Sequence, residues 1–349
     1  MGPKKAISPI IAIIIILLIT IAIAGAGFSY ISTYWTSLTG KQIQVINSFC
    51  VQTGHQGKIM ISNVGTSSID TKEIRVINAR TEEDITQDVL WSKEASDPDL
   101  VLELRFDEGS GTKAIDTSGQ GNEGALKNDT GTSSCFTNGA CPVWVDGKRG
   151  GALEFDGDGD YVDCGNDASL DITDEITLEA WVYNEGQSGH RRGVVGKRHS
   201  NEYIYGLVVE NNEFAFLSWL SVPKQEYTSG VKIKVDQWTH IVATVSSSNV
   251  VKLYANGKEA KEEYTLTTKN MAGNGKIRIG ASGATYFNGL IDEVRIYDRA
   301  LSPSKIEDLA ENSVTVEAGE TAYMTHTCKG RCSYKLVLGG SARKASLEC

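Results

Sequence analysis

An uncharged, strongly apolar segment near the start of the chain limits its possible architectures more than any other feature. Residues 9–27 read PIIAIIIILLITIAIAGAG, and no charged residue occurs between Lys5 and Lys41. Nineteen such residues in a helix are long enough to span the hydrocarbon core of a bilayer. Because Lys4 and Lys5 precede the segment and no basic residue follows it until Lys41, the positive-inside rule predicts a cytoplasmic Met1 and an extracellular body.

The rest of the chain is acidic and soluble in character. All 44 Asp and Glu residues lie beyond position 41, together with 31 of the 34 Lys and Arg residues, so this part carries a net charge of −13. Such a charge argues against broad neutralisation of phosphates, and we expect no nucleic-acid partner. A length of 349 residues allows two domains that each bury a core.

The N-terminal segment has three interpretations. A plain signal anchor is the simplest, and Ala24-Gly25-Ala26 also fits the small-residue cleavage site of a secretory signal, with a mature start near Gly27. The third rests on the junction Lys5-Ala6-Ile7-Ser8-Pro9, where polar residues give way to the apolar run. This junction resembles the class III signal of archaeal type IV pilins.

The pilin resemblance implies a leader, 1–6, that is cut between Ala6 and Ile7. The helix of residues 7–41 would then hold the protein in the membrane before assembly. In a filament it would pack against identical or related pilin subunits. Bacterial pilins carry Glu at the fifth mature position, which is Ile11 here, so the match is to the archaeal branch.

Short alternating strands occupy two separate parts of the body, residues 42–99 and 311–349. Neither part is long enough to bury a core alone, so we expect them to form one small β-sandwich together. The strings NVGT at 63–66 and EAGET at 317–321 resemble the globular β domain of archaeal pilins. Residues 100–310 are then an insertion between its strands, which costs little at an exposed loop.

The inserted segment contains many alternating strands at near-regular spacing, which is typical of a β-sandwich or jelly roll. It begins with LVLELRFDEGSG at 100–111 and ends with NGLIDEVRIYDRALS at 288–302. Between them, Asn256-Gly257 predicts a tight hairpin, and Ser302 before Pro303 predicts the start of a short helix. The order of these strings resembles LamG-like, concanavalin A-like jelly rolls, which mostly bind carbohydrate or protein.

A structural calcium site is expected in this domain. The loop from Asp116 to Asn122 offers carboxylate, hydroxyl and amide oxygens, which suit Ca²⁺. Strand alternation places Asp292 on the face of Val294 and Ile296, so this carboxylate should point into the core. The family resemblance implies that Asp116, Asn122 and Asp292 share the ion. The alternative is a turn held by hydrogen bonds alone.

No pattern in the chain is typical of an enzyme. Glu175 and Glu179 share a strand face, as a glycosidase pair would, but solvated strand faces explain them more simply. Aromatic residues that could stack on sugars are Trp181, Tyr183, Tyr203, Tyr205, Trp219 and Tyr286. Most of these are expected in the core, and the sequence does not select a ligand-binding set.

Seven cysteines and one glycosylation sequon fit an extracellular body. Cys135 and Cys141 would close one loop, and Cys50 could join the two halves of the split domain by pairing with one of the last three cysteines. Those three are Cys328, Cys332 and Cys349. Because seven is odd, at least one cysteine stays free or pairs between subunits, and we expect this one to be Cys164. Asn128-Asp129-Thr130 is the sequon.

The sequence therefore predicts a transmembrane or assembly helix and an all-β body, in which a split pilin-type β-sandwich carries an inserted LamG-like jelly roll. The leading functional hypothesis is a pilin-like subunit of an archaeal cell-surface filament that displays the jelly roll for adhesion to glycan or protein. The alternatives are a membrane-anchored lectin that does not polymerise and a surface glycan hydrolase.

Overall fold

The computed structural model describes most of the body of the chain. The described residues are 40–51, 56–93, 97–129, 135, 141–186, 191–199, 202–218, 225–260, 263–267, 271, 273–327, 331–339 and 341–348. The predicted leader, and all of the predicted apolar helix except residues 40 and 41, lie outside these ranges. Within them, no helix is long and apolar enough to cross a membrane.

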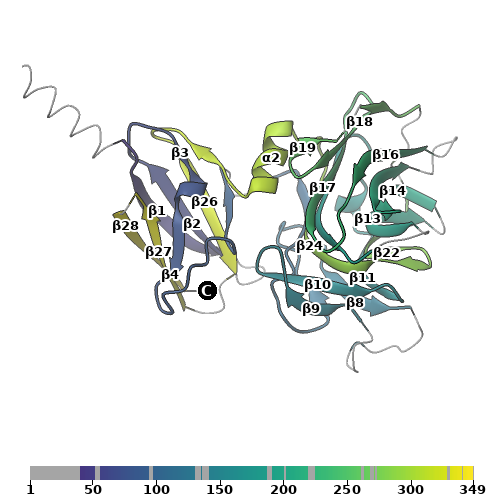
Figure 1. Cartoon of the computed structure of the whole chain (residues 1–349), viewed down its shortest axis with the longest axis horizontal. Coiled ribbons are helices and arrows are strands. Elements are labelled where there is room, and N and C mark those ends of the chain that lie inside the picture. The colour runs from purple at the N-terminus through teal and green to yellow at the C-terminus, as the bar shows by residue number, and fades with distance from the viewer. Residues whose placement is uncertain are drawn as a thin grey trace, which may run out of the picture.

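Two large antiparallel sheets form the jelly roll, seen at the right of Figure 1. The nine-stranded sheet contains β6 (Leu100–Leu104), β9 (Val143–Asp146), β10 (Gly151–Asp156), β12 (Ile176–Asn184), β17 (Trp238–Val245), β18 (Val250–Ala255), β19 (Lys258–Glu259), β20 (Tyr264–Thr265) and β24 (Asn288–Tyr297). The eight-stranded sheet contains β7 (Lys113–Ala114), β8 (Gly124–Asn128), β11 (Asp160–Gly165), β13 (Arg192–His199), β14 (Glu202–Glu210), β15 (Glu213–Ser218), β16 (Gln225–Lys232) and β21 (Lys276–Ile279). Two short elements complete it, the 3-10 helix η2 (Ala168–Leu170) and the hairpin of β22 (Ala281–Ser282) and β23 (Thr285–Tyr286).

The core of the jelly roll lies between these sheets. Alternate residues of the strands meet there, including Leu178 and Val182 of β12, Leu207 of β14 and Phe216 of β15. This alternation is the expected pattern for a sandwich, and the prediction of an all-β body with a jelly roll is confirmed.

Two local signals in the sequence also have the predicted outcome. Asn256 and Gly257 have φ of 49° and 79° and connect β18 to β19, as a tight hairpin requires. Helix α2 (Pro303–Glu311) begins with Pro303, and the Ser302 side chain accepts a hydrogen bond from the backbone N–H of Lys305.

The predicted orientation of Asp292 is wrong, because β24 contains a bulge. Glu293 has φ of 50°, and the pairing of β12 with β24 shifts register between Glu179 and Trp181. Two residues of β24 therefore face one residue of β12, and both Ile291 and Val294 reach the core. Asp292 pairs with Trp181 and lies on the outer face of the nine-stranded sheet, where it is nevertheless buried.

The two ends of the described chain share smaller sheets, at the left of Figure 1. One consists of β1 (Ile43–Val51), β2 (Gln56–Asn63), β26 (Thr321–Thr327) and β5 (Leu90–Ser92). The others consist of β4 (Arg75–Asn78) with β27 (Arg331–Leu338) and β28 (Ser341–Glu348), and of β3 (Ile69–Asp70) with β25 (Thr315–Val316). The 3-10 helix η1 (Thr71–Glu73) follows β3. Their buried side chains form one core, with Ile59, Val76, Met324 and Leu336 among its members, and we call this unit the split domain.

One contact between the split domain and the jelly roll lies at an end of the central strands of the four-stranded sheet. Thr327, the last residue of β26, donates a hydrogen bond to Asp107 Oδ2 (2.8 Å). In the pairing of β26 with β2, Thr327 is opposite Gln56 at the start of β2. Ile43, at the start of β1, is instead opposite Asn63, at the other end of β2. The chain therefore enters the split domain at the end of this sheet away from Thr327.

Candidate functional site

The predicted calcium ligand Asp116 is saturated by hydrogen bonds from its own surroundings. Oδ1 accepts from the backbone N–H groups of Glu103 (2.9 Å) and Ser118 (3.0 Å). Oδ2 accepts from the Ser118 hydroxyl and the backbone N–H of Asn122, both at 2.8 Å. This is the geometry of the hydrogen-bonded turn that the sequence left as the alternative.

Asn122 and Asp292 each retain one buried oxygen without a hydrogen bond, Oδ1 in both cases. The two residues belong to different places, however: Asn122 lies in the loop before β8, and the Arg149 backbone of the β9–β10 hairpin donates to Asp292. No three acidic, His or Cys side chains in the described ranges could hold a metal together. Calcium at Asp116, Asn122 and Asp292 stays a prediction, tested by whether Ca²⁺ raises a melting temperature that Asp116→Ala makes insensitive to it.

An ionic network covers part of the outer face of the nine-stranded sheet. Arg295 of β24 lies between its cross-strand partners Glu103 and Glu179. Its Nε donates to Glu103 (2.8 Å), its Nη1 donates to Glu179 (3.0 Å), and its Nη2 pairs with Glu293. Arg295 is only 2% exposed, so the network is a buried structural feature.

The network removes Glu179 from the glycosidase pair considered above. Glu179 is fully buried and also bonds His240 Nε2 (3.0 Å). Burial opposes its ionisation, but Arg295 and His240 outweigh it, so the pKa of Glu179 is lowered. Glu175 accepts hydrogen bonds from the backbones of Ser247 and Ala300. These two carboxylates therefore do not flank a cleft together.

The rest of the same outer face presents a row of partly exposed side chains, four of them aromatic or aliphatic and one a carboxylate, which we call the aromatic row. Its members are successive cross-strand partners on five strands, namely Trp238, Tyr183, Leu290, Glu154 and Val143. The Tyr183 and Trp238 rings meet edge to face, with centroids 5.7 Å apart. Val143 at one end is 45% exposed, and Val235, three residues before Trp238, is 42% exposed.

Carboxylates lie in and beside the aromatic row. Glu185 follows β12 and is largely exposed. Its pKa is raised by partial burial and by the negative charges of Glu154 and Asp236, so these three acids lie close together. Five strands at about 4.8 Å spacing make the row about 19 Å long. Flat rings beside hydrogen-bond acceptors of this kind can stack on sugar rings and accept bonds from their hydroxyl groups.

Other aromatic residues from the sequence prediction are not available to a ligand in this way. Trp181 is covered by the β9–β10 hairpin, with Lys148 Nζ at 4.8 Å and Arg149 Cζ at 5.5 Å from its ring centroid. Tyr205 is in the core, where its hydroxyl donates to the carbonyl of Leu170. Tyr203, on β14 of the eight-stranded sheet, is buried, and Tyr286, on the β22–β23 hairpin, is partly exposed. Trp219 lies outside the described residues.

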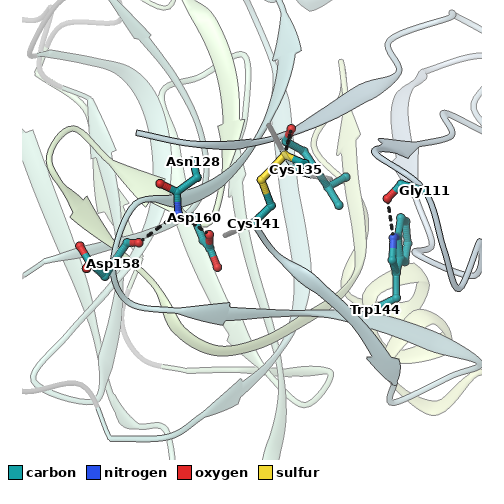
Figure 2. Close-up of a disulfide and its surroundings, with 8 residues drawn as sticks. Gly111, Asn128, Cys135, Cys141, Trp144, Asp158 and Asp160 are labelled. Carbon is teal, nitrogen blue, oxygen red and sulfur yellow. Dashed lines mark hydrogen bonds between the residues drawn. A yellow bond between two sulfur atoms is a disulfide. The ribbon is translucent and has the colours of Figure 1, made fainter. Parts of the chain in front are cut away.

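A hollow of about 810 Å³ lies between the jelly roll and the split domain, and we call it the junction cleft. Its walls include Asp88 and His326 from the split domain and Asp107, Trp144 and Asp146 from the jelly roll. The Trp144 indole donates to the carbonyl of Gly111 at 2.9 Å (Figure 2). Burial and the nearby Arg105 lower the pKa of His326 to about 4, so its imidazole is neutral at pH 7.

Part of the predicted disulfide pattern falls within the described residues. The predicted disulfide between Cys135 and Cys141 is present (Figure 2), and Cys332 is also disulfide-bonded. The side chains of Cys50, Cys328 and Cys349 lie outside the described part.

We expect the free Cys164 to be unreactive in the folded protein. It is buried in the core, and this burial raises the pKa of its thiol, which suppresses the reactive thiolate. Peptide mapping after iodoacetamide treatment should find Cys164 modified only when denaturant was present. Its modification under native conditions would contradict the described core.

The glycosylation candidate Asn128 is engaged by its neighbours. Its Nδ2 donates to Asp160 Oδ1 (3.0 Å) and to the Asp158 carbonyl (3.3 Å), as Figure 2 shows. A glycan attached at this nitrogen would have to displace at least one of these bonds. Glycosylation of Asn128 stays a prediction.

Asp160→Asn should raise the melting temperature at pH 8, and this increase should be larger than the change that it causes at pH 4. Burial, with a smaller effect of Asp156, raises the pKa of Asp160 from 3.8 to about 6. The stability that this group contributes is therefore complete below about pH 4 and is lost as the pH rises through 6. Asparagine stays neutral throughout. Thermal unfolding at both pH values, with the exposed Asp158→Asn as control, measures the effect; an equal change at both would contradict this assignment.

Comparison with known proteins agrees with this architecture. Residues 156–307 match the family described as the concanavalin A-like lectin/glucanases superfamily. Domain 4 of AbnA, a GH43 extracellular arabinanase from Geobacillus stearothermophilus, solved in complex with arabinotriose, is 27% identical; the match covers 60% of this chain and 98% of that one, with a TM-score of 0.50. The chain therefore contains a concanavalin A-like jelly-roll domain.

Two toxin domains match more weakly. The binding domain of Paraclostridial Mosquitocidal Protein 1 is 18% identical over 61% of this chain and 52% of its own, with a TM-score of 0.47. The receptor binding domain of botulinum neurotoxin C/D mosaic serotype is 15% identical over 61% and 51%, also with a TM-score of 0.47. The chain spans about half of each. No curated protein matches the chain.

Of the aromatic row, only Tyr183 is among the ligand-stacking candidates that the sequence offers. Trp238 and His240 are two residues apart on β17, and Trp181 and Tyr183 are two residues apart on β12, so each pair shares a strand face. Predicting that these residues adjoin one another requires the order of the strands in the sheet, which a single sequence does not give. The junction cleft was missed for the same reason, since its walls come from residues 88–151 and 326–327.

Proposed function

We propose that the jelly roll is a glycan-binding module, with the aromatic row as its ligand-binding surface. The observation that carries this proposal is the pair of partly exposed rings, Tyr183 and Trp238, beside Glu154 and Glu185 on the outer face of the nine-stranded sheet. Support comes from the arabinanase domain, which was solved with a bound trisaccharide and is 27% identical. The row is long enough for a short oligosaccharide.

A binding assay with matched variants of aromatic residues tests this proposal. The protein is titrated with arabinotriose and then with a panel of neutral glycans, and the same titrations are made with Trp238→Ala, Tyr183→Ala and Trp144→Ala. We expect the first two variants to weaken binding at least about tenfold, since each removes a stacking surface. Trp144→Ala should have little effect, because Trp144 lines the junction cleft.

The same assay has outcomes that reject the proposal. Loss of binding in Trp144→Ala alone would move the site to the junction cleft. If the protein bound no glycan but captured a protein ligand, and Trp238→Ala abolished that capture, the row would be a protein-binding surface.

We further propose that the chain is a pilin-like subunit of an archaeal cell-surface filament, with the module displayed on the cell exterior. The junction of Ala6 and Ile7 supports this, as does the pairing of the two chain ends in one small β unit. The chain enters that unit at the end of β1 away from the contact of Thr327 with Asp107. This arrangement would leave the jelly roll free to face outward from a filament.

The mature N-terminus of the native protein, measured by intact mass, tests the pilin proposal. A start at Ile7 is the expected result. An uncut Met1 would instead indicate a membrane-anchored lectin, and a start near Gly27 would indicate a cleaved secretory signal; either would overturn assembly through the helix.

A further inference from the structure

A basic hollow lies on the outer face of the eight-stranded sheet, opposite the sheet that carries the aromatic row. Its volume is about 320 Å³. Its residues come from β13, from β21 and the loop before it, and from the β22–β23 hairpin. Strands β13 and β22 are labelled at the right of Figure 1. The residues around it are Arg198, His199, Asn274, Gly275, Lys276, Arg278 and Gly283.

Aromatic rings hold two guanidinium groups at this hollow. Arg198 Cζ is 4.7 Å from the ring centroid of Tyr203, and Arg278 Cζ is 4.4 Å from that of Tyr161. The Tyr203 ring in turn lies against Gly206, where an added Cβ would approach it to 2.4 Å. Because these rings are fixed by packing, the guanidinium groups lose little additional freedom when they bind a ligand.

The cations are close enough to repel one another. Arg198 and Lys276 are directly opposite each other in the β13–β21 pairing, an arrangement that destabilises a sheet. Burial lowers the pKa of Arg198, and the nearby charge of Arg278 lowers it further. An anion between these groups would relieve the repulsion.

Two carboxylates balance the cations in part. Asp163 Oδ2 pairs with Lys276 (3.1 Å), and Asp129 Oδ2 lies 3.6 Å from Arg278. Asp129 also accepts a hydrogen bond from the hydroxyl of Tyr286, a partly exposed ring that could contact a sugar. Among the described residues at the hollow, three cations and two carboxylates give a net positive charge.

We propose that this hollow binds the anionic group, carboxylate or sulfate, of an acidic saccharide. Arginine presents a planar fork of donors that matches both groups. The chain's overall charge of −10 does not prevent this, because charges beyond about 8 Å are largely screened at physiological ionic strength. Only the saccharide part of the inference depends on the proposed function; the anion site follows from the charges themselves.

Titration calorimetry with trigalacturonate, galactose 6-sulfate and neutral galactose tests this site. We expect at least one of the two anionic sugars, and not galactose, to bind, with an affinity that falls as NaCl rises from about 50 to 300 mM. Arg278→Gln should weaken binding about tenfold or more, since it removes a charge-assisted hydrogen bond.

Three variants keep this test decisive. Lys276→Gln, at a side chain that is 56% exposed, should weaken binding without affecting folding. Lys232→Gln makes the same charge change at a 65% exposed position on β16 of the same sheet and should leave binding unchanged. Trp238→Ala should also leave it unchanged, which separates this site from the aromatic row. Three results would each overturn the proposal. The first is that galactose binds as tightly as the anionic sugars, and the second is that Lys276→Gln and Lys232→Gln weaken binding equally. The third is that the protein binds anionic vesicles but neither anionic sugar.

Discussion

Replacing Arg295 with methionine should destabilise the protein by about 3–5 kcal/mol, because it removes a buried cation that three carboxylates share. Arg295 contacts Glu103, Glu179 and Glu293, and neither Glu179 nor Glu293 is exposed to solvent. Urea unfolding at pH 7 measures the loss. Arg75→Ala is the matched control: it removes an exposed pair with Asp84 and should cost under about 1 kcal/mol.

The pH dependence of this loss distinguishes charge from packing. Burial opposes the ionisation of Glu103, but Arg295 and Arg105 outweigh it and lower its pKa from 4.5 to about 2. The stability from this group is therefore complete above about pH 4.5 and is lost as the pH falls towards 2. In Arg295→Met the carboxylates can take up protons at mildly acidic pH, so the destabilisation should shrink there. A loss of the same size at pH 4 and pH 7 would mean that packing alone was removed.

Gly289→Ala should destabilise the protein by about 3 kcal/mol or more, although it adds a single methyl group. Gly289 has φ of 132°, and a Cβ there would come within 2.1 Å of the Tyr183 carbonyl oxygen. That oxygen belongs to the backbone of β12, so the strand itself would have to move. Tyr183 is also part of the aromatic row, and the same substitution should weaken glycan binding.

Gly109→Ala provides the comparison for this effect. Gly109 also has a positive φ, 66°, but nothing lies within 4 Å of a Cβ at that position. It should therefore cost only the backbone strain of about 1 kcal/mol. Thermal unfolding of both variants measures the difference, and equal losses would show that the approach of β12 to β24 is looser than described.

The jelly roll could be predicted from the sequence because its signals are local. Alternation identified strands such as β12 and β17, the Asn256-Gly257 pair identified a hairpin, and Ser302-Pro303 identified the start of α2. Each depends on residues within a few positions of one another. In the split domain, alternation indicated short strands in residues 42–99 and 311–349 but not their pairing, which joins strands far apart in the chain, such as β2 and β26.

The outer face of the nine-stranded sheet could not be predicted in this way. One residue with positive φ, Glu293, reverses the orientation of Asp292 relative to Val294, and nothing in the composition of this strand signals it. The charges of Glu179 and Arg295 would ordinarily indicate a solvated face. They are buried because Arg149 and helix α2 lie over this face, with Arg149 donating to the Leu309 carbonyl at the end of α2.

Tryptophan indole NMR tests the central claim, saccharide binding at the aromatic row, most directly. The protein contains six tryptophans, and ¹⁵N-indole signals can be assigned by single substitutions. On titration with the tightest-binding glycan of the panel, the Trp238 signal should shift. Trp181, which lies under Lys148 and Arg149, and Trp144, which lines the junction cleft, should not. A shift of Trp144 without Trp238, or no indole shift at saturating glycan, would contradict the account.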